Sequence, residues 1–143
     1  MEKSFIGDHN NDIRVINLYF EAVQKRYDFE INDTLNPVLG EFCIVETARG
    51  LEMGKVYTKA SYIKPDTISV PLKKVVRIAT EKDMEKYSDL KVEAVKASYV
   101  LKNKIKKFNL NMKSIETEFT FDRKKLIFYF ASEDRVDFRE LVK

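Results

Sequence analysis

The spacing of the apolar residues changes at Thr80, and this change limits the possible folds more than any other feature of the sequence. Before Thr80, short apolar runs alternate with turn residues, which is typical of β-strands. After Thr80, apolar residues recur every three or four positions, which predicts one long helix over residues 80–108. The stripe consists of Tyr87, Leu90, Ala94, Ala97, Leu101, Ile105 and Phe108. The sequence therefore predicts an α+β fold.

The part before the helix is predicted to be a small bent antiparallel β-sheet or a partly open barrel, since closure protects sheet edges. Gly50 supplies the positive φ that a two-residue Arg49–Gly50 hairpin turn requires, and this turn pairs position 46 with position 53. Gly54 lies inside a strand and predicts a bulge. The expected strands cover residues 13–20, 26–31, 41–48, 51–57 and 72–78.

The part that begins at Thr80 is predicted to hold the long helix, a β-hairpin packed on it and a short C-terminal helix. Thr80 and Asp83 form a capping pair at the start of the long helix, and Asp137 caps the short one. Alternating residues in 114–121 and 126–130 predict the hairpin. The expected division is a flexible tail over 1–12, a β-rich subdomain over 13–79 and an α/β subdomain over 80–143, which is incomplete at its C-terminal end.

The rare residue types exclude several classes of protein. Cys43 is the single cysteine and His9 the single histidine, so the chain by itself forms neither a disulfide nor a zinc finger. Cys43 lies between apolar strand residues, which favours a small buried hydrophobe over a reactive thiol. No phosphate-binding glycine motif, leader sequence or membrane-length apolar run occurs. We therefore expect a soluble protein of a reducing compartment, without membrane insertion or enzymatic activity.

The net charge of +3 comes entirely from the residues after Thr80. There, a turn with Arg123, Lys124 and Lys125 joins two aromatic strands, an arrangement that can stack bases and hold phosphates. The aromatic side chains are Phe119, Phe121, Phe128, Tyr129 and Phe130. The four phenylalanines also fit a core that faces the helix, and this second interpretation is favoured.

The charged residues around the first hairpin have two interpretations. Glu46 and Glu52 are predicted to point to opposite faces of the sheet, which excludes a cooperating acid–base pair. Arg49 and Arg123 lie at turns, where arginines can bind carboxylates or phosphates of a partner. Alternatively each arginine closes an internal ion pair, for example Arg49 with Glu46 or Glu52.

Three segments of the chain resemble one known family. Residues 45–56 (VETARGLEMGKV) are similar to its V-E-x-x-R-G-x-E-x-G-x-V hairpin, and residues 72–83 (LKKVVRIATEKD) to its second block. The third block comprises 118–123 (EFTFDR), 126–130 (LIFYF) and 135–143 (RVDFRELVK). In this order and spacing they resemble the YaaT (RicT)-like family, whose shared region is named after a yeast polymerase-suppressor protein.

The resemblance implies a cytoplasmic regulatory adaptor that assembles with small helical YlbF-like and YmcA-like proteins. It implies a role in sporulation, competence and biofilm control and in mRNA processing by RNase Y, with direct RNA binding by the basic second half as the alternative. The family's iron–sulfur cluster and flavin are not carried over, because its cysteine-rich segment does not occur in this chain. The residues expected to contact a partner or RNA are Glu46, Arg49, Glu52, Arg77, Arg123, Lys124, Lys125, Arg135 and Arg139.

Overall fold

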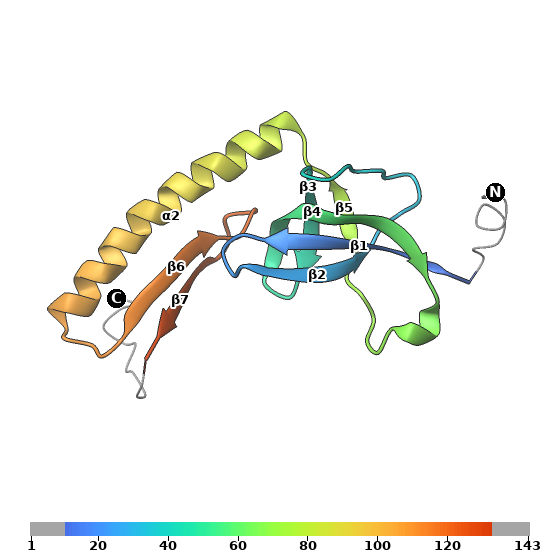
Figure 1. Cartoon of the computed structure of the whole chain (residues 1–143). Coiled ribbons are helices and arrows are strands. Elements are labelled where there is room, and N and C mark those ends of the chain that lie inside the picture. The colour runs from blue at the N-terminus through green and yellow to red at the C-terminus, as the bar shows by residue number, and fades with distance from the viewer. Residues whose placement is uncertain (1–10, 133–143) are drawn as a thin grey trace. The chain divides into compact units, whose positions relative to one another are not determined.

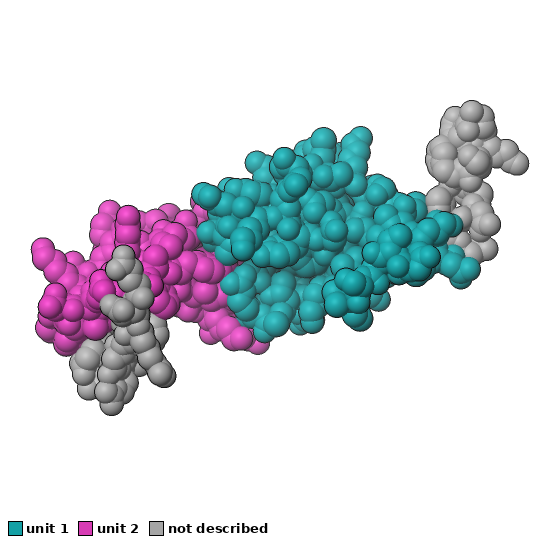
Figure 2. Space-filling view, turned by 60° about the horizontal axis from the view of Figure 1, so that its bottom comes forward, with its two compact units in different colours: residues 1–80 teal, residues 81–143 magenta. Residues whose placement is uncertain are grey.

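The computed structural model describes residues 11–132, and the chain divides into two compact units (Figures 1 and 2). The first unit comprises residues 1–80 and the second residues 81–143. The predicted helix at Asp137 lies outside the described residues, as does most of the predicted tail. Within the described part of the chain, no helix is long and apolar enough to cross a membrane.

The first unit is a five-stranded antiparallel sheet with the strand order β2-β1-β4-β3-β5 (Figure 1). The long strand β4 pairs first with β3 and then with β1, up to the pair Ile13–Ile63, and therefore extends beyond its predicted end. A short 3-10 helix, Pro65–Thr67, follows β4. The strands are β1 Ile13–Phe20, β2 Lys25–Glu30, β3 Phe42–Thr47, β4 Gly50–Ile63 and β5 Val75–Ile78.

The two edge strands of this sheet approach each other at one point. The backbone N–H of Glu30, at the end of β2, donates to the carbonyl oxygen of Lys73 at 2.9 Å. Glu30 and Lys74 form a single parallel bridge at the same place, just before β5 begins. The sheet is thus strongly curved without closing into a barrel, in agreement with the predicted α+β fold and its open sheet.

Alternating residues on the strands build the core of the first unit. On β1, Ile16, Leu18 and Phe20 are buried because every second side chain points to the same face of the sheet. Burial of such a side chain contributes about 1.5 to 3 kcal/mol relative to its exposure to water. The complete cluster is Ile16, Leu18, Phe20, Phe29, Ile31, Cys43, Val45, Val56 and Val75.

The predicted turn and bulge of the β3–β4 hairpin were wrong. Thr47 pairs with Gly50, so the turn residues are Ala48 and Arg49, and Gly50 begins β4 with a φ of 123°. The β3–β4 pairing runs without interruption past Gly54, while the irregular positions lie in the β1–β4 pairing.

Gly54 serves close packing instead of a bulge. A Cβ atom at position 54 would lie 2.9 Å from the Cβ of Leu18 and 2.9 Å from the Cζ of Phe20. Real Cβ atoms essentially never come this close to another heavy atom. Glycine therefore lets β4 lie against the side chains of β1.

The second unit consists of the helix α2 (Glu81–Lys107) and the hairpin of β6 (Lys113–Phe119) and β7 (Leu126–Ala131). The buried apolar residues of α2 are Leu90, Ala94 and Leu101, all from the predicted stripe, and α2 packs against β6 as Figure 1 shows.

The hairpin of the second unit departs from the predicted alternation at Ile115. Ile115 was expected on the buried face, but its side chain is 63% exposed. The β6–β7 register shifts between Ser114 and Glu116, and the extra residue of this bulge leaves the buried face.

Candidate functional site

The turn between β3 and β4 holds a buried carboxylate. Glu52 is 6% exposed, and its Oε1 atom lies 2.9 Å from a guanidinium nitrogen of Arg49. The hydroxyl of Thr47 donates to the other carboxylate oxygen, and the backbone N–H of Arg49 donates to the Thr47 oxygen at 3.2 Å. Both oxygens of Glu52 thus have partners, which offsets much of the cost of burying a charge.

The internal ion pair anticipated as one interpretation of Arg49 is therefore present. Glu52 is its partner, while Glu46 is exposed. Glu46 pairs with Leu51 and Glu52 with Val45, so the two glutamates point to opposite faces, as predicted, although the register differs from the expected one. The Arg49 side chain remains 40% exposed and also presents a cation at the surface of the turn.

The turn between β6 and β7 is held by its own side chains. Thr120 is 1% exposed, and its hydroxyl donates to Oδ1 of Asp122 at 2.7 Å. The backbone N–H of Lys124 donates to the same Oδ1 at 3.0 Å, and that of Lys125 donates to the Thr120 hydroxyl oxygen at 3.1 Å. Arg123 has a φ of 63°, in the left-handed region. These contacts fix the backbone from which the three basic side chains project.

Arg123 is paired within the second unit. Its guanidinium lies 2.8 Å from Oε1 of Glu93 on α2 and 5.7 Å from the centre of the Phe119 ring. Close by on the same hairpin, the ring of Phe121 is buried and carries the ammonium of Lys86 at 4.5 Å. Phe121 thus belongs to the core, as the favoured interpretation predicts. The ring of Phe119 instead lies below the guanidinium of Arg123, which is at the surface.

The remaining predicted site residues are placed as follows. Arg77 is exposed on β5, opposite Ile44 of β3. Thr80 directly precedes α2, at the predicted capping position. Lys124 and Lys125 are exposed beside Arg123. Arg135 and Arg139 lie outside the described residues, as does Asp137.

The sequence did not reveal the residues that support these turns. Thr47, Thr120 and Asp122 were overlooked, although Thr and Asp near a turn are known to hydrogen-bond its backbone. Glu93 was overlooked as the partner of Arg123, which is 30 residues away and could not be identified without the fold.

Arg14 is a further residue whose role is not indicated by its neighbours in the sequence. Its guanidinium donates to the carbonyl oxygens of Asn32 and Leu35, at 2.8 and 2.6 Å, and to Oδ1 of Asn36 at 2.8 Å. One side chain of β1 therefore holds the loop that follows β2.

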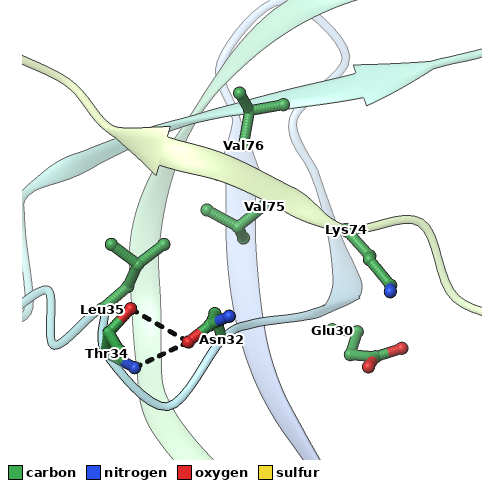
Figure 3. Close-up of a pocket in the computed structure, with 7 residues that line it drawn as sticks. All are labelled: Glu30, Asn32, Thr34, Leu35, Lys74, Val75 and Val76. Carbon is green, nitrogen blue, oxygen red and sulfur yellow. Dashed lines mark hydrogen bonds between the residues drawn. The ribbon is translucent and has the colours of Figure 1, made fainter.

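That loop borders a hollow of about 300 Å³ beside the seam between β2 and β5 (Figure 3). Oδ1 of Asn32 accepts hydrogen bonds from the backbone N–H and the hydroxyl of Thr34, both at 2.9 Å. The other lining residues are Glu30, Leu35, Lys74, Val75 and Val76. None of the predicted site residues lines this hollow.

Cys43 does not fit an iron–sulfur site. It is fully buried, and burial, with a smaller effect of the Glu41 charge, raises the pKa of its thiol to about 11. Metal ions bind the thiolate, and a four-thiolate cluster needs further cysteines. The described residues also contain no group of three or more His, Cys, Asp or Glu side chains that could hold a metal ion.

Comparison with known proteins gives the family. The PSP1 C-terminal conserved region matches residues 73–143. Stage 0 sporulation protein YaaT of Bacillus subtilis is 40% identical over 130 residues, which cover 90% of this chain and 46% of YaaT. The chain thus spans about half the length of this relative.

Two yeast proteins share shorter or weaker similarity. An uncharacterized protein of Schizosaccharomyces pombe is 27% identical over 81% of this chain and 19% of its own length. Protein PSP1 of Saccharomyces cerevisiae is 59% identical over 34 residues, 24% of this chain and 4% of that protein. No solved structure matches the chain. From the PSP1 region and the similarity to YaaT, the chain belongs to the YaaT-like family.

Proposed function

We propose that the chain is part of a regulatory protein that acts by binding other macromolecules and has no catalytic activity of its own. The 40% identity to a sporulation protein over 90% of the chain carries this proposal. In its finer form, the protein is a cytoplasmic adaptor that assembles with YlbF-like and YmcA-like helical proteins. Through them it acts in sporulation, competence and biofilm control and in mRNA processing by RNase Y.

The β6–β7 turn is the surface that we assign to these contacts. It lies in the region matched by the PSP1 family, and Lys124 and Lys125 are exposed on it. The hydrogen bonds of Thr120 and Asp122 fix the turn before any partner binds. Preorganisation lowers the entropic cost of binding, so a fixed basic turn is well suited to recognise an acidic surface.

The test is a titration of the chain with purified YlbF-like and YmcA-like proteins by calorimetry. Lys124→Ala/Lys125→Ala is expected to weaken binding roughly 5- to 10-fold, as removal of two complementary charges does. The matched control, Lys59→Ala/Lys73→Ala, removes two exposed lysines of the first unit and should bind like the wild type. Absence of binding by the wild type would refute the adaptor proposal.

Direct RNA binding is the second candidate, and the excess of basic residues after Thr80 favours it. The turn also places Arg123 over Phe119, so a cation and an aromatic ring lie together beside the two lysines. If these residues contact phosphates, affinity for a single-stranded RNA falls steeply with salt, and the double lysine variant lowers the slope of log K against log salt by about 1.4. A flat salt dependence would refute this candidate.

A further inference from the structure

The helix α2 has two apolar faces on opposite sides. With 3.6 residues per turn, Leu90, Ala94 and Leu101 form the stripe that is buried in the second unit. A second stripe at the same spacing comprises Val92, Val95 and Tyr99, which are 54%, 55% and 65% exposed. A helix of a solvated surface normally carries polar residues on this side. The exposed stripe therefore needs a partner to be buried.

Charged residues extend the exposed stripe in both directions, with opposite signs. Glu85 and Asp89 precede the apolar stripe, and Lys102 and Lys106 follow it, all exposed. At 1.5 Å per residue, this strip from 85 to 106 is about 32 Å long. It is acidic at one end and basic at the other, and its middle is apolar except for the exposed Lys96.

We propose that this strip, residues 85–106 of α2, pairs with the same strip of a second copy of the chain in an antiparallel arrangement. A two-fold axis near position 95 places Glu85 opposite Lys106 and Asp89 opposite Lys102. The same axis places Val92 opposite Tyr99, so that the apolar centres also meet. The strip is thus self-complementary in charge and in polarity, as a two-fold symmetric interface requires. A parallel arrangement would place like charges opposite each other.

The strip is short, so the dimer is expected to be weak. Three exposed apolar side chains per copy bury less area than a permanent homodimer does, and exposed ion pairs add little affinity each. Sedimentation velocity should detect the dimer at chain concentrations between about 10 and 500 µM, because small interfaces typically have dissociation constants in this range.

Paired charge reversals test both the interface and its direction. Glu85→Lys/Asp89→Lys makes both ends of the strip basic, and Lys102→Glu/Lys106→Glu makes both ends acidic. Each variant alone should lose at least 10-fold in dimer affinity, while an equimolar mixture of the two should form a heterodimer. Lys59→Glu/Lys73→Glu makes the same change in net charge as Lys102→Glu/Lys106→Glu but lies outside α2, and it should dimerise like the wild type.

Circular dichroism of each variant verifies that α2 remains folded, and Val95→Lys gives a second, independent disruption at the centre of the strip. A wild-type chain that stays monomeric at 500 µM would overturn the proposal and leave the strip for a different helical protein. Failure of the mixed variants to associate would overturn the interface. Equal dimerisation of every variant would overturn the antiparallel register, because in a parallel pair each double reversal only exchanges one set of like-charge contacts for another.

Discussion

Replacement of Arg49 by alanine tests whether the arginine of the β3–β4 turn stabilises the fold. The change leaves the Glu52 carboxylate, which is 6% exposed, with the hydroxyl of Thr47 as its remaining hydrogen-bond donor. Loss of one partner of a fully buried ion pair costs about 3 to 5 kcal/mol. Since the Arg49 side chain is 40% exposed, water replaces part of the interaction, and we expect a loss of about 1.5 to 2 kcal/mol.

A double-mutant cycle separates this pair from other effects of the substitution. Glu52→Gln keeps the shape of the side chain and removes its charge, so Arg49→Ala should cost about 1 kcal/mol less in the Glu52→Gln background than in the wild type. The free energy of unfolding is measured by urea titration followed by circular dichroism. Glu46→Gln, on the exposed opposite face, serves as the control and should change stability by less than about 0.5 kcal/mol. A coupling energy near zero would show that Arg49 is not held for stability, and would favour its role in recognition.

Three further results are expected in the first unit. Gly54→Ala should lower the free energy of unfolding, measured by urea titration, by about 1 to 3 kcal/mol, because the added Cβ meets the Cβ of Leu18. Gly40→Ala is the control: an added Cβ has open space there, but the φ of 91° should still cost about 1 kcal/mol. A cost at Gly40 that equals or exceeds the cost at Gly54 would contradict the packing argument. Arg14→Ala should increase hydrogen exchange in residues 32–36, which the guanidinium holds through three hydrogen bonds, and unchanged protection would contradict this role. The raised pKa of Cys43, about 11 against 9.0 in the unfolded chain, means that the unfolded state loses its proton first as the pH rises. The stability advantage of wild type over Cys43→Ala should therefore shrink by about 2 kcal/mol between pH 9 and 11, and a constant difference would show that the thiol is not shielded.

The sequence was sufficient to predict the fold class because two kinds of apolar periodicity follow each other without overlap. Residues 13–20 were predicted as a strand, and β1 has these bounds. The helix expected over 80–108 spans Glu81–Lys107. Both elements have long, regular patterns, and local spacing determines which of their faces is buried.

The register of the hairpins could not be predicted from local spacing alone. The Arg49–Gly50 pair signals a turn, but a glycine with positive φ fits either the turn or the first strand position after it. The need for a glycine at residue 54 comes from the side chains of Leu18 and Phe20, which belong to another strand. Ile115 leaves the buried face because of a bulge, which the alternation of its neighbours does not indicate. The first error is a shift of the turn by one residue, the second concerns a contact between segments that are distant in sequence, and the third concerns a single extra residue.

The family motif at the β3–β4 hairpin is explained largely by folding. Gly50 adopts the positive φ at the start of β4, Arg49 neutralises buried Glu52, and Gly54 allows β4 to approach β1. Residues with such roles tell us which fold a relative adopts, but they do not locate a binding surface. Among the residues of this motif, Glu46 is exposed on the opposite face of the sheet and remains a candidate for external contacts. Recognition by this chain is therefore best sought on surfaces whose side chains take no part in the β3–β4 hairpin. These surfaces are the basic β6–β7 turn and the exposed strip of α2.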